Sequence, residues 1–244
     1  MVSSTRWAAL CLKAACVAST VLSIGLAPAA LAQACSDVAL VLAVDGSGSI
    51  DAGEFRFQQQ AIADSLRDPD VLEAMARAGT VSVAAVFWGD PNRPVQETEA
   101  VVITGRDGAD RLAGIIENMP RRVLGNTGLS AGLEAALDKL ATMGCAHRPI
   151  INVSGDGKGT ILSRRSRKSP RLEEVRARAA AEGVTINALT ISNEETDLAQ
   201  YYQQKVITGP GAFVMDIRNF ADYAQAFRRK LVREIAPQIV AMAK

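Results

Sequence analysis

The chain has 244 residues, of which 48% are apolar and 22% are charged. This balance is typical of a globular protein with a buried core and excludes an intrinsically disordered chain. The formal net charge is +1, which gives no bulk attraction to nucleic acid or to a membrane surface, so we expect no nucleic-acid partner.

The first 32 residues are predicted to be an export signal. Arg6 provides a short positive region, residues 14–31 are apolar and uncharged, and a small-x-small cleavage pattern ends at Ala32. The alternatives are an uncleaved membrane anchor and a lipoprotein modified at Cys35, but the cleavage pattern favours removal. We therefore expect a single mature domain over residues 33–244, periplasmic or secreted, with no segment that spans a membrane.

Apolar runs and helical patterns then alternate along the chain. Continuous apolar runs predict buried strands, and a 3.6-residue apolar period predicts helices. The predicted strands are residues 38–44, 80–88, 100–104, 149–154, 184–191 and 212–215. The predicted helices are residues 51–66, 71–77, 107–119, 129–143, 170–181 and 220–235. This alternation predicts an α/β fold, with a doubly wound, mostly parallel central sheet and helices on both faces.

Polar side chains follow several of these strands. The run from Asp45 to Ser49 reads Asp-Gly-Ser-Gly-Ser and comes directly after the first strand. Thr127 lies in a glycine-flanked loop before a helix, and Asp156 follows a later buried strand. Ligands of an open α/β sheet bind outside the carboxyl ends of its strands. Carboxylate and hydroxyl oxygens suit Mg²⁺, or a similar cation such as Mn²⁺ or Ca²⁺, so the sequence predicts a divalent-metal site.

The Asp-x-Ser-x-Ser loop, the distant threonine and the later Asp-Gly resemble the metal-ion-dependent adhesion site of von Willebrand factor A domains. The resemblance covers about residues 37–235. It implies that the two serines and the threonine contact the metal, that the aspartates act through water or switch coordination, and that an acidic side chain of a protein partner completes the octahedron. The implied ligands are Asp45, Ser47, Ser49, Thr127 and Asp156. More narrowly, four stretches resemble a bacterial family of exported A-like proteins of unknown function: residues 153–157, 201–202, 209–214 and 227–235.

Two cysteines remain after removal of the signal. Cys35 and Cys145 precede Asp45 and Asp156 by ten and eleven residues. In the A-domain topology the two strands are parallel neighbours, so the resemblance implies a Cys35–Cys145 disulfide at the end of the sheet opposite the metal. The alternative is two free thiols. His147 is the only histidine, and we expect it to be structural or solvated, because one histidine and one cysteine do not make a zinc site.

Other residues are candidates for the rim of the site. Trp88 and Asp90 follow the second strand, and Trp88 is either an exposed anchor for a partner or a residue that closes the edge of the core. A basic segment follows the Asp156 strand and either steers an acidic partner or forms a solvated loop. Its basic residues are Arg164, Arg165, Arg167, Lys168 and Arg171.

Three functional hypotheses follow. The first is a non-enzymatic binding module that uses the cation to hold an acidic group of a protein partner. The second is a metal-dependent hydrolase or phosphoryl-transfer enzyme, because an aspartate after a buried strand also occurs in aspartyl-phosphate enzymes. Against it, position 47 is a serine and His147 is predicted at the opposite end of the sheet. The third is a scaffold with a structural metal. The partner and the oligomeric state stay open.

Overall fold

The structure is a computed structural model that describes residues 35–160 and 170–237. Its strands form one seven-stranded sheet in the order β3-β2-β1-β5-β6-β7, with β4 also paired to β2. The strands β1, β2, β5, β6 and β7 are parallel, and β3 and β4 run antiparallel to β2. The bounds are β1 Ser36–Asp45, β2 Val81–Trp88, β3 Gln96–Glu97, β4 Val101–Ile103, β5 Ala146–Gly155, β6 Thr185–Ile191 and β7 Val214–Ile217. The predicted doubly wound α/β fold is confirmed.

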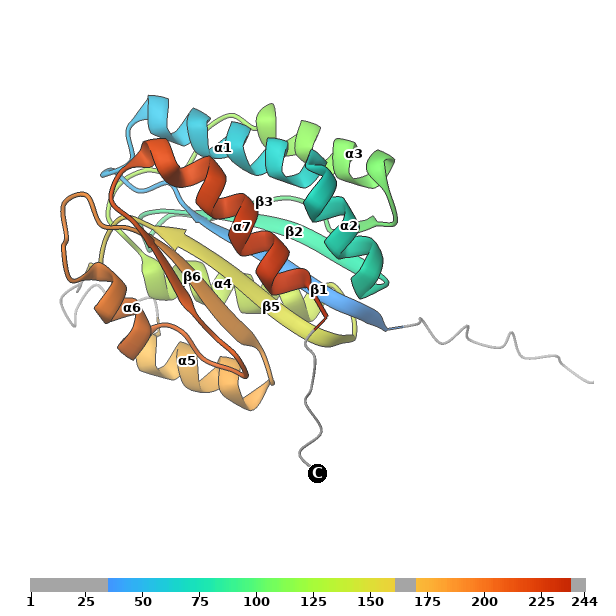
Figure 1. The fold of residues 1–244 in the computed structure, drawn as a ribbon. Coiled ribbons are helices and arrows are strands. Elements are labelled where there is room, and N and C mark those ends of the chain that lie inside the picture. The colour runs from blue at the N-terminus through green and yellow to red at the C-terminus, as the bar shows by residue number, and fades with distance from the viewer. Residues whose placement is uncertain (1–34, 161–169, 238–244) are drawn as a thin grey trace, which may run out of the picture. The chain divides into compact units, whose positions relative to one another are not determined.

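Helices cover both faces of this sheet (Figure 1). One face carries α1, α2, α3 and α7, and the other carries α4, α5 and α6. The helices are α1 Ala52–Arg67, α2 Pro69–Ala78, α3 Arg106–Glu117, α4 Leu129–Thr142, α5 Leu172–Ala181, α6 Leu198–Lys205 and α7 Tyr223–Ile235. Among these helices, none is long and apolar enough to cross a bilayer.

The central strand β1 explains the two-layered core. Leu40, Leu42 and Val44 point into the core beneath α1 and α7, whereas Val41 and Ala43 point into the core beneath α4. Successive side chains of a strand alternate between the faces of the sheet, so a strand covered on both faces needs apolar residues at every position. The uninterrupted apolar run is therefore the sequence signature of this strand.

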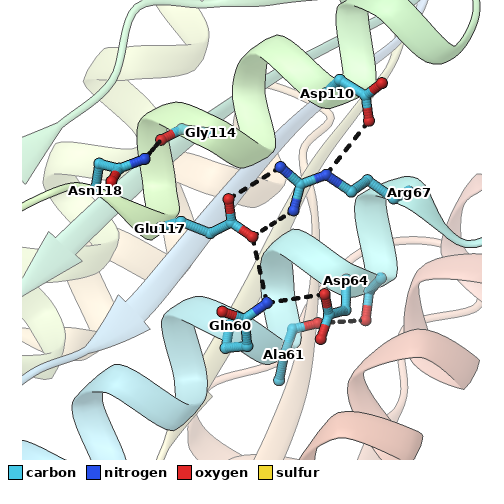
Figure 2. A network of polar contacts seen from close by, with 9 residues as sticks. Gln60, Ala61, Asp64, Arg67, Asp110, Gly114, Glu117 and Asn118 are labelled. Carbon is cyan, nitrogen blue, oxygen red and sulfur yellow. Dashed lines mark hydrogen bonds and ion pairs between the residues drawn. The ribbon is translucent and has the colours of Figure 1, made fainter.

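Helix α1 is fixed at both ends. Asp51 accepts hydrogen bonds from the backbone N–H groups of Gly53 and Glu54, and the Glu54 carboxylate accepts one from Asp51 N–H at 2.8 Å. This is the capping box that the sequence predicts. Near the other end, the Arg67 guanidinium donates to both carboxylate oxygens of Glu117 and to Asp110 of α3 (Figure 2). These contacts hold α3 beside α1.

Several boundaries differ from the predicted ones, and two elements, β3 and α6, were not predicted. Residues 220–222 form a 3-10 turn before α7. The last strand spans residues 214–217 rather than 212–215, because Gly209 and Gly211, with φ of 95° and 69°, turn the backbone just before it. Helix α6 was not predicted, because its buried apolar signal consists of only Leu198 and Tyr202.

The predicted disulfide is present between Cys35 and Cys145, with an S–S distance of 2.06 Å. Cys35 directly precedes β1 and Cys145 directly precedes β5. Because these strands are parallel neighbours, the disulfide lies at their amino ends. The polar loops follow their carboxyl ends, at the opposite edge of the sheet.

Candidate metal site

The five predicted ligands lie together at the carboxyl ends of β1 and β5. The Ser49 hydroxyl donates to Asp156 Oδ1 at 2.8 Å. The Ser47 hydroxyl lies 3.3 Å from Ser49 Oγ and 3.4 Å from Thr127 Oγ1. Asp45 Oδ1 accepts the Ser47 backbone N–H at 2.8 Å. The fold therefore gathers two carboxylates and three hydroxyls from three separate loops around one point.

The Asp45 carboxylate carries the least compensated charge of this cluster. It is fully buried, and its Oδ2 atom accepts no hydrogen bond from residues 35–160 or 170–237. Burial, together with the negative charge of Asp156, raises the pKa of Asp45 to about 8. Burial also raises the pKa of Asp156, although the bond from Ser49 opposes that shift. A buried carboxylate without a partner is costly, so these residues fit a positive ion.

The donor chemistry narrows the class of ion. Within the described residues, no three His, Cys, Asp or Glu side chains are grouped to hold a metal. The cluster instead combines two carboxylates with three hydroxyls, all of them oxygen donors. Hard divalent cations such as Mg²⁺ prefer such donors. The residues present therefore fit a hard divalent cation better than a thiolate- or imidazole-bound transition metal.

Glycines allow the loops to approach each other closely. Gly48 N–H donates to the Gly125 carbonyl at 2.7 Å, and a Cβ atom on Gly48 would lie 3.1 Å from that same oxygen. A Cβ atom on Gly46 would lie 2.5 Å from Val123 Cγ2. Larger residues at these positions would push the loop of residues 45–49 (the serine loop) away from the loop that holds Thr127 (the threonine loop).

Arg121 organises the first loop, and sequence reasoning did not find it. Its side chain is partly buried, and its guanidinium lies 5.0 Å from the centroid of the Phe55 ring. Nothing in the sequence separates Arg121 from its neighbour Arg122, because the role depends on a bend of the chain that no local pattern reveals. Its Nη2 donates to the carbonyl oxygens of Gly46 at 3.0 Å, Ser47 at 2.9 Å and Ile50 at 2.7 Å.

Asp90 braces the threonine loop. Its Oδ2 accepts a hydrogen bond from Asn126 Nδ2 at 2.9 Å, and its Oδ1 accepts one from Asn92 N–H at 2.8 Å. These bonds, led by the one from the Asn92 backbone, lower the pKa of Asp90. Thr127 N–H in turn donates to the Thr160 hydroxyl at 3.2 Å. Asp90 thus links its own loop, through Asn92, to the threonine loop, through Asn126.

Of the two alternatives predicted for Trp88, the exposed anchor is wrong. Trp88 is 1% exposed and belongs to the core beneath α4. A Cβ atom on Gly132 of α4 would overlap its ring, so the indole fills the space that this glycine leaves. The alternative prediction, that Trp88 closes the edge of the core, agrees with this packing. Leu124, which is 49% exposed and precedes the threonine loop, is an apolar rim residue that the sequence did not single out.

The remaining rim candidates have separate outcomes. Arg164, Arg165, Arg167 and Lys168 lie outside the described residues. Arg171 is exposed at the start of α5.

Two residues after Asp156 lies Lys158, the lysine closest to the site in sequence. Its Nζ lies 2.7 Å from Asp197 Oδ1 and 3.3 Å from Glu195 Oε2. Beneath the same loop, buried Tyr202 donates from its hydroxyl to the Gly157 carbonyl at 3.3 Å. The lysine is therefore neutralised by acidic neighbours and does not act as a free cation beside the site.

Comparisons with solved structures identify the fold. The pilus adhesin SpaC from Lactobacillus rhamnosus GG is 15% identical and superposes with a TM-score of 0.58. The superposition covers 83% of this chain and 31% of SpaC. The mussel byssus protein PTMP1, described with a zinc-occupied MIDAS motif, is 18% identical, with a TM-score of 0.57 over 82% of this chain and 48% of PTMP1. The von Willebrand domain of the pilus tip protein Mfa5 from Porphyromonas gingivalis is 13% identical, with a TM-score of 0.54 over 86% and 99% of the two chains.

The chain thus spans about a third of SpaC and about half of PTMP1, and at these identities the likeness concerns the fold. Curated protein sequences contain no match. A family model described as "Protein of unknown function (DUF1194)" matches residues 34–239. The chain therefore has the von Willebrand factor A fold and belongs to this family of proteins of unknown function.

Proposed function

We propose that the protein is an exported, non-enzymatic binding module that holds one divalent cation and uses it to engage an acidic group on a protein partner. The observation that carries this proposal is the buried Asp45 carboxylate, whose Oδ2 has no hydrogen-bond partner in the described part of the chain. A cation among the five side chains would compensate this charge. The bound cation would also attract a further carboxylate from a partner protein.

In this proposal the hydroxyls of Ser47, Ser49 and Thr127 contact the cation, and the carboxylates of Asp45 and Asp156 act through water or by switching coordination. A side chain from the partner supplies the remaining ligand. Mg²⁺ is the first choice because all five donors are hard oxygens, and Mn²⁺ and Ca²⁺ share that preference. The zinc-occupied site described for PTMP1 supports a divalent ion at this position of the fold.

A binding role is favoured over catalysis by the surroundings of the site. His147 lies at the start of β5, and Asp156 follows the end of the same strand, so the histidine is a strand length away. Lys158 is engaged by two carboxylates. The similar proteins SpaC and PTMP1 are an adhesin and a matrix protein by description. These observations support a site that presents a cation rather than one that activates a nucleophile.

Export is the second part of the proposal. Disulfides persist in oxidising compartments, and the Cys35–Cys145 bond supports such a location. The proposed signal, residues 1–32, lies outside the described residues. Expression of the full chain in a bacterium should yield an exported product whose amino-terminal sequence begins at Gln33. A product that keeps residues 1–32 in the membrane fraction would contradict cleavage.

The binding role is tested with labelled acidic peptides. We expect an aspartate-containing tetrapeptide to bind the mature chain in millimolar Mg²⁺, and the matching asparagine peptide not to bind. EDTA or Thr127→Val should abolish binding, because each removes part of the cation site. Thr142→Val is the matched control, since its hydroxyl donates to the Lys139 carbonyl at the end of α4 and is not a proposed ligand. Equal binding with EDTA and with Mg²⁺ would refute the proposal.

A further inference from the structure

A cavity of about 360 Å³ adjoins the five-oxygen site, which is formed by the side chains of Asp45, Ser47, Ser49, Thr127 and Asp156. Thr127 lies in its wall, so one side chain belongs to both. The cavity lies where the loop before α4 meets the beginning of α5 and the outer face of α6. Its volume is at the lower end of the roughly 300–1,000 Å³ of ligand pockets, which suits one large side chain and its neighbours.

The walls of this cavity are mainly apolar. Pro91 lies on one side, Leu129 and Leu172 come from the beginnings of α4 and α5, and the half-buried ring of Tyr201 comes from α6. Gly159 keeps the space open, because a Cβ atom there would already lie 3.3 Å from Leu129 Cβ. An apolar side chain that entered this space would be removed from water, which favours binding.

The rim of the cavity carries positive charge. Arg171 and Lys205 line it and are exposed, and Glu173 is the one acidic residue that joins them. Every aspartate and glutamate of the chain lies within the described residues, and none of them forms an ion pair with Arg171 or Lys205. Lys158, by contrast, is already neutralised. The rim therefore complements a negatively charged ligand.

We propose that this cavity is the second half of the partner-binding surface and that it accepts an acidic peptide segment of a protein. One carboxylate of the segment faces the five-oxygen site, the large apolar side chain next to it enters the cavity, and a further carboxylate pairs with Arg171 or Lys205. Adjacent residues of an extended peptide have Cα atoms about 3.8 Å apart, and Thr127 belongs to both subsites. This inference rests on the proposed function and adds the chemistry of the partner.

The first test compares two probes in Mg²⁺, the capped peptides Gly-Asp-Trp-Gly and Gly-Asp-Gly-Gly. Burial of one large apolar side chain predicts that the tryptophan peptide binds about tenfold tighter or more. Equal affinities would overturn the cavity proposal, and would be found if another part of the chain fills this space. If both peptides bind only in the presence of Mg²⁺, the proposed function is supported whatever their relative affinities. Failure of the cavity proposal is therefore distinguishable from failure of the proposed function.

The second test fills the cavity. Ser130 is half-buried in its wall and is not a proposed ligand of the cation. Ser130→Phe should abolish the preference for the tryptophan peptide and leave the Mg²⁺ affinity and the binding of the glycine peptide unchanged. A preference that persists in a folded variant would overturn the proposal.

Charge at the rim gives a third test that needs no change in packing. Lys205→Gln and Gln203→Glu each lower the net charge of α6 by one, but only Lys205 lines the cavity. With the capped peptide Gly-Asp-Trp-Asp, Lys205→Gln should weaken binding severalfold more than Gln203→Glu does. Equal effects of the two variants would contradict the assignment of Lys205 to the peptide.

Discussion

Ser49 and Asp156 are separated by 107 residues, yet the Ser49 hydroxyl donates to Asp156 Oδ1 at 2.8 Å. The bond joins the loops that follow β1 and β5, two parallel strands in which Val44 lies opposite Ser154. The sheet therefore sets the distance between the two halves of the site, and the loops need only turn the side chains inward. Changes that disturb the sheet or the loop backbone should weaken the site without removing a ligand.

Arg121→Ala is the sharpest test of the loop backbone. The carbonyls of Gly46, Ser47 and Ile50 would lose their charged donor, so we expect the free energy of unfolding to fall by about 2–3 kcal/mol. Mg²⁺ affinity should fall at least tenfold, because the serine loop loosens. Urea unfolding and calorimetry measure the two effects. The exposed neighbour Arg122→Ala is the control, and equal behaviour of the two variants would show that Arg121 does not organise the loop.

Two helical glycines should respond in opposite directions to alanine. Gly132→Ala in α4 would drive a methyl group into the Trp88 ring, and overpacking of this kind costs about 1–3 kcal/mol. Gly114→Ala in α3 meets no atom within 4 Å and should stabilise the protein by about 0.5–1 kcal/mol, the usual gain of alanine over glycine in a helix. Thermal unfolding of both variants checks the packing assigned to Trp88, and a neutral Gly132→Ala would contradict it.

A buried ion pair within α7 is hydrogen-bonded to β5 through Asn152. Lys230 Nζ lies 2.7 Å from Glu234 Oε1, and Asn152 Nδ2 donates to Glu234 Oε2 at 2.6 Å. Burial lowers the pKa of Lys230 to about 8 and raises the pKa of Glu234. Because both side chains are buried, Lys230→Met should cost about 3–5 kcal/mol by leaving a buried carboxylate unpaired.

A double-mutant cycle separates the pair from simple loss of packing. Lys230→Met combined with Glu234→Gln should recover much of the lost stability, since the glutamine carbonyl can still accept the Asn152 bond without a buried charge. Exposed Arg229→Met serves as the control for loss of a cation on α7. Strictly additive effects in urea unfolding would contradict a coupled pair.

The disulfide should support stability but not cation binding. Cys35 and Cys145 are 110 residues apart, so in the chain-entropy model the double substitution to alanine lowers the free energy of unfolding by up to roughly 4–5 kcal/mol. Mg²⁺ affinity should stay within about twofold, since the bond lies at the amino ends of the strands. A large loss of affinity in a variant that remains folded would show that the two ends of the sheet are coupled.

The sequence predicted the parts of the site that depend on local pattern. The apolar run of β1 and the polar residues that follow it place Asp45 at a strand end, and the same reasoning places Asp156. It did not predict Arg121, because that contact depends on a loop folding back across more than 70 residues. Nor did it decide between an exposed and a buried Trp88, since this depends on the absence of a side chain at Gly132 in a distant helix.

The central claim is that five oxygen-bearing side chains bind one divalent cation. Calorimetric titration of Mg²⁺ into the mature chain tests it most directly, beside Asp45→Asn with Ser47→Ala and beside exposed Asp64→Ala as a control. Asparagine keeps an acceptor for the Ser47 N–H, so the double variant removes the charge and a hydroxyl with little other change. We predict one binding site in the wild type and in the control, and none in the double variant. Binding that survives in the double variant, or its absence from the wild type even with added acetate, would contradict the account.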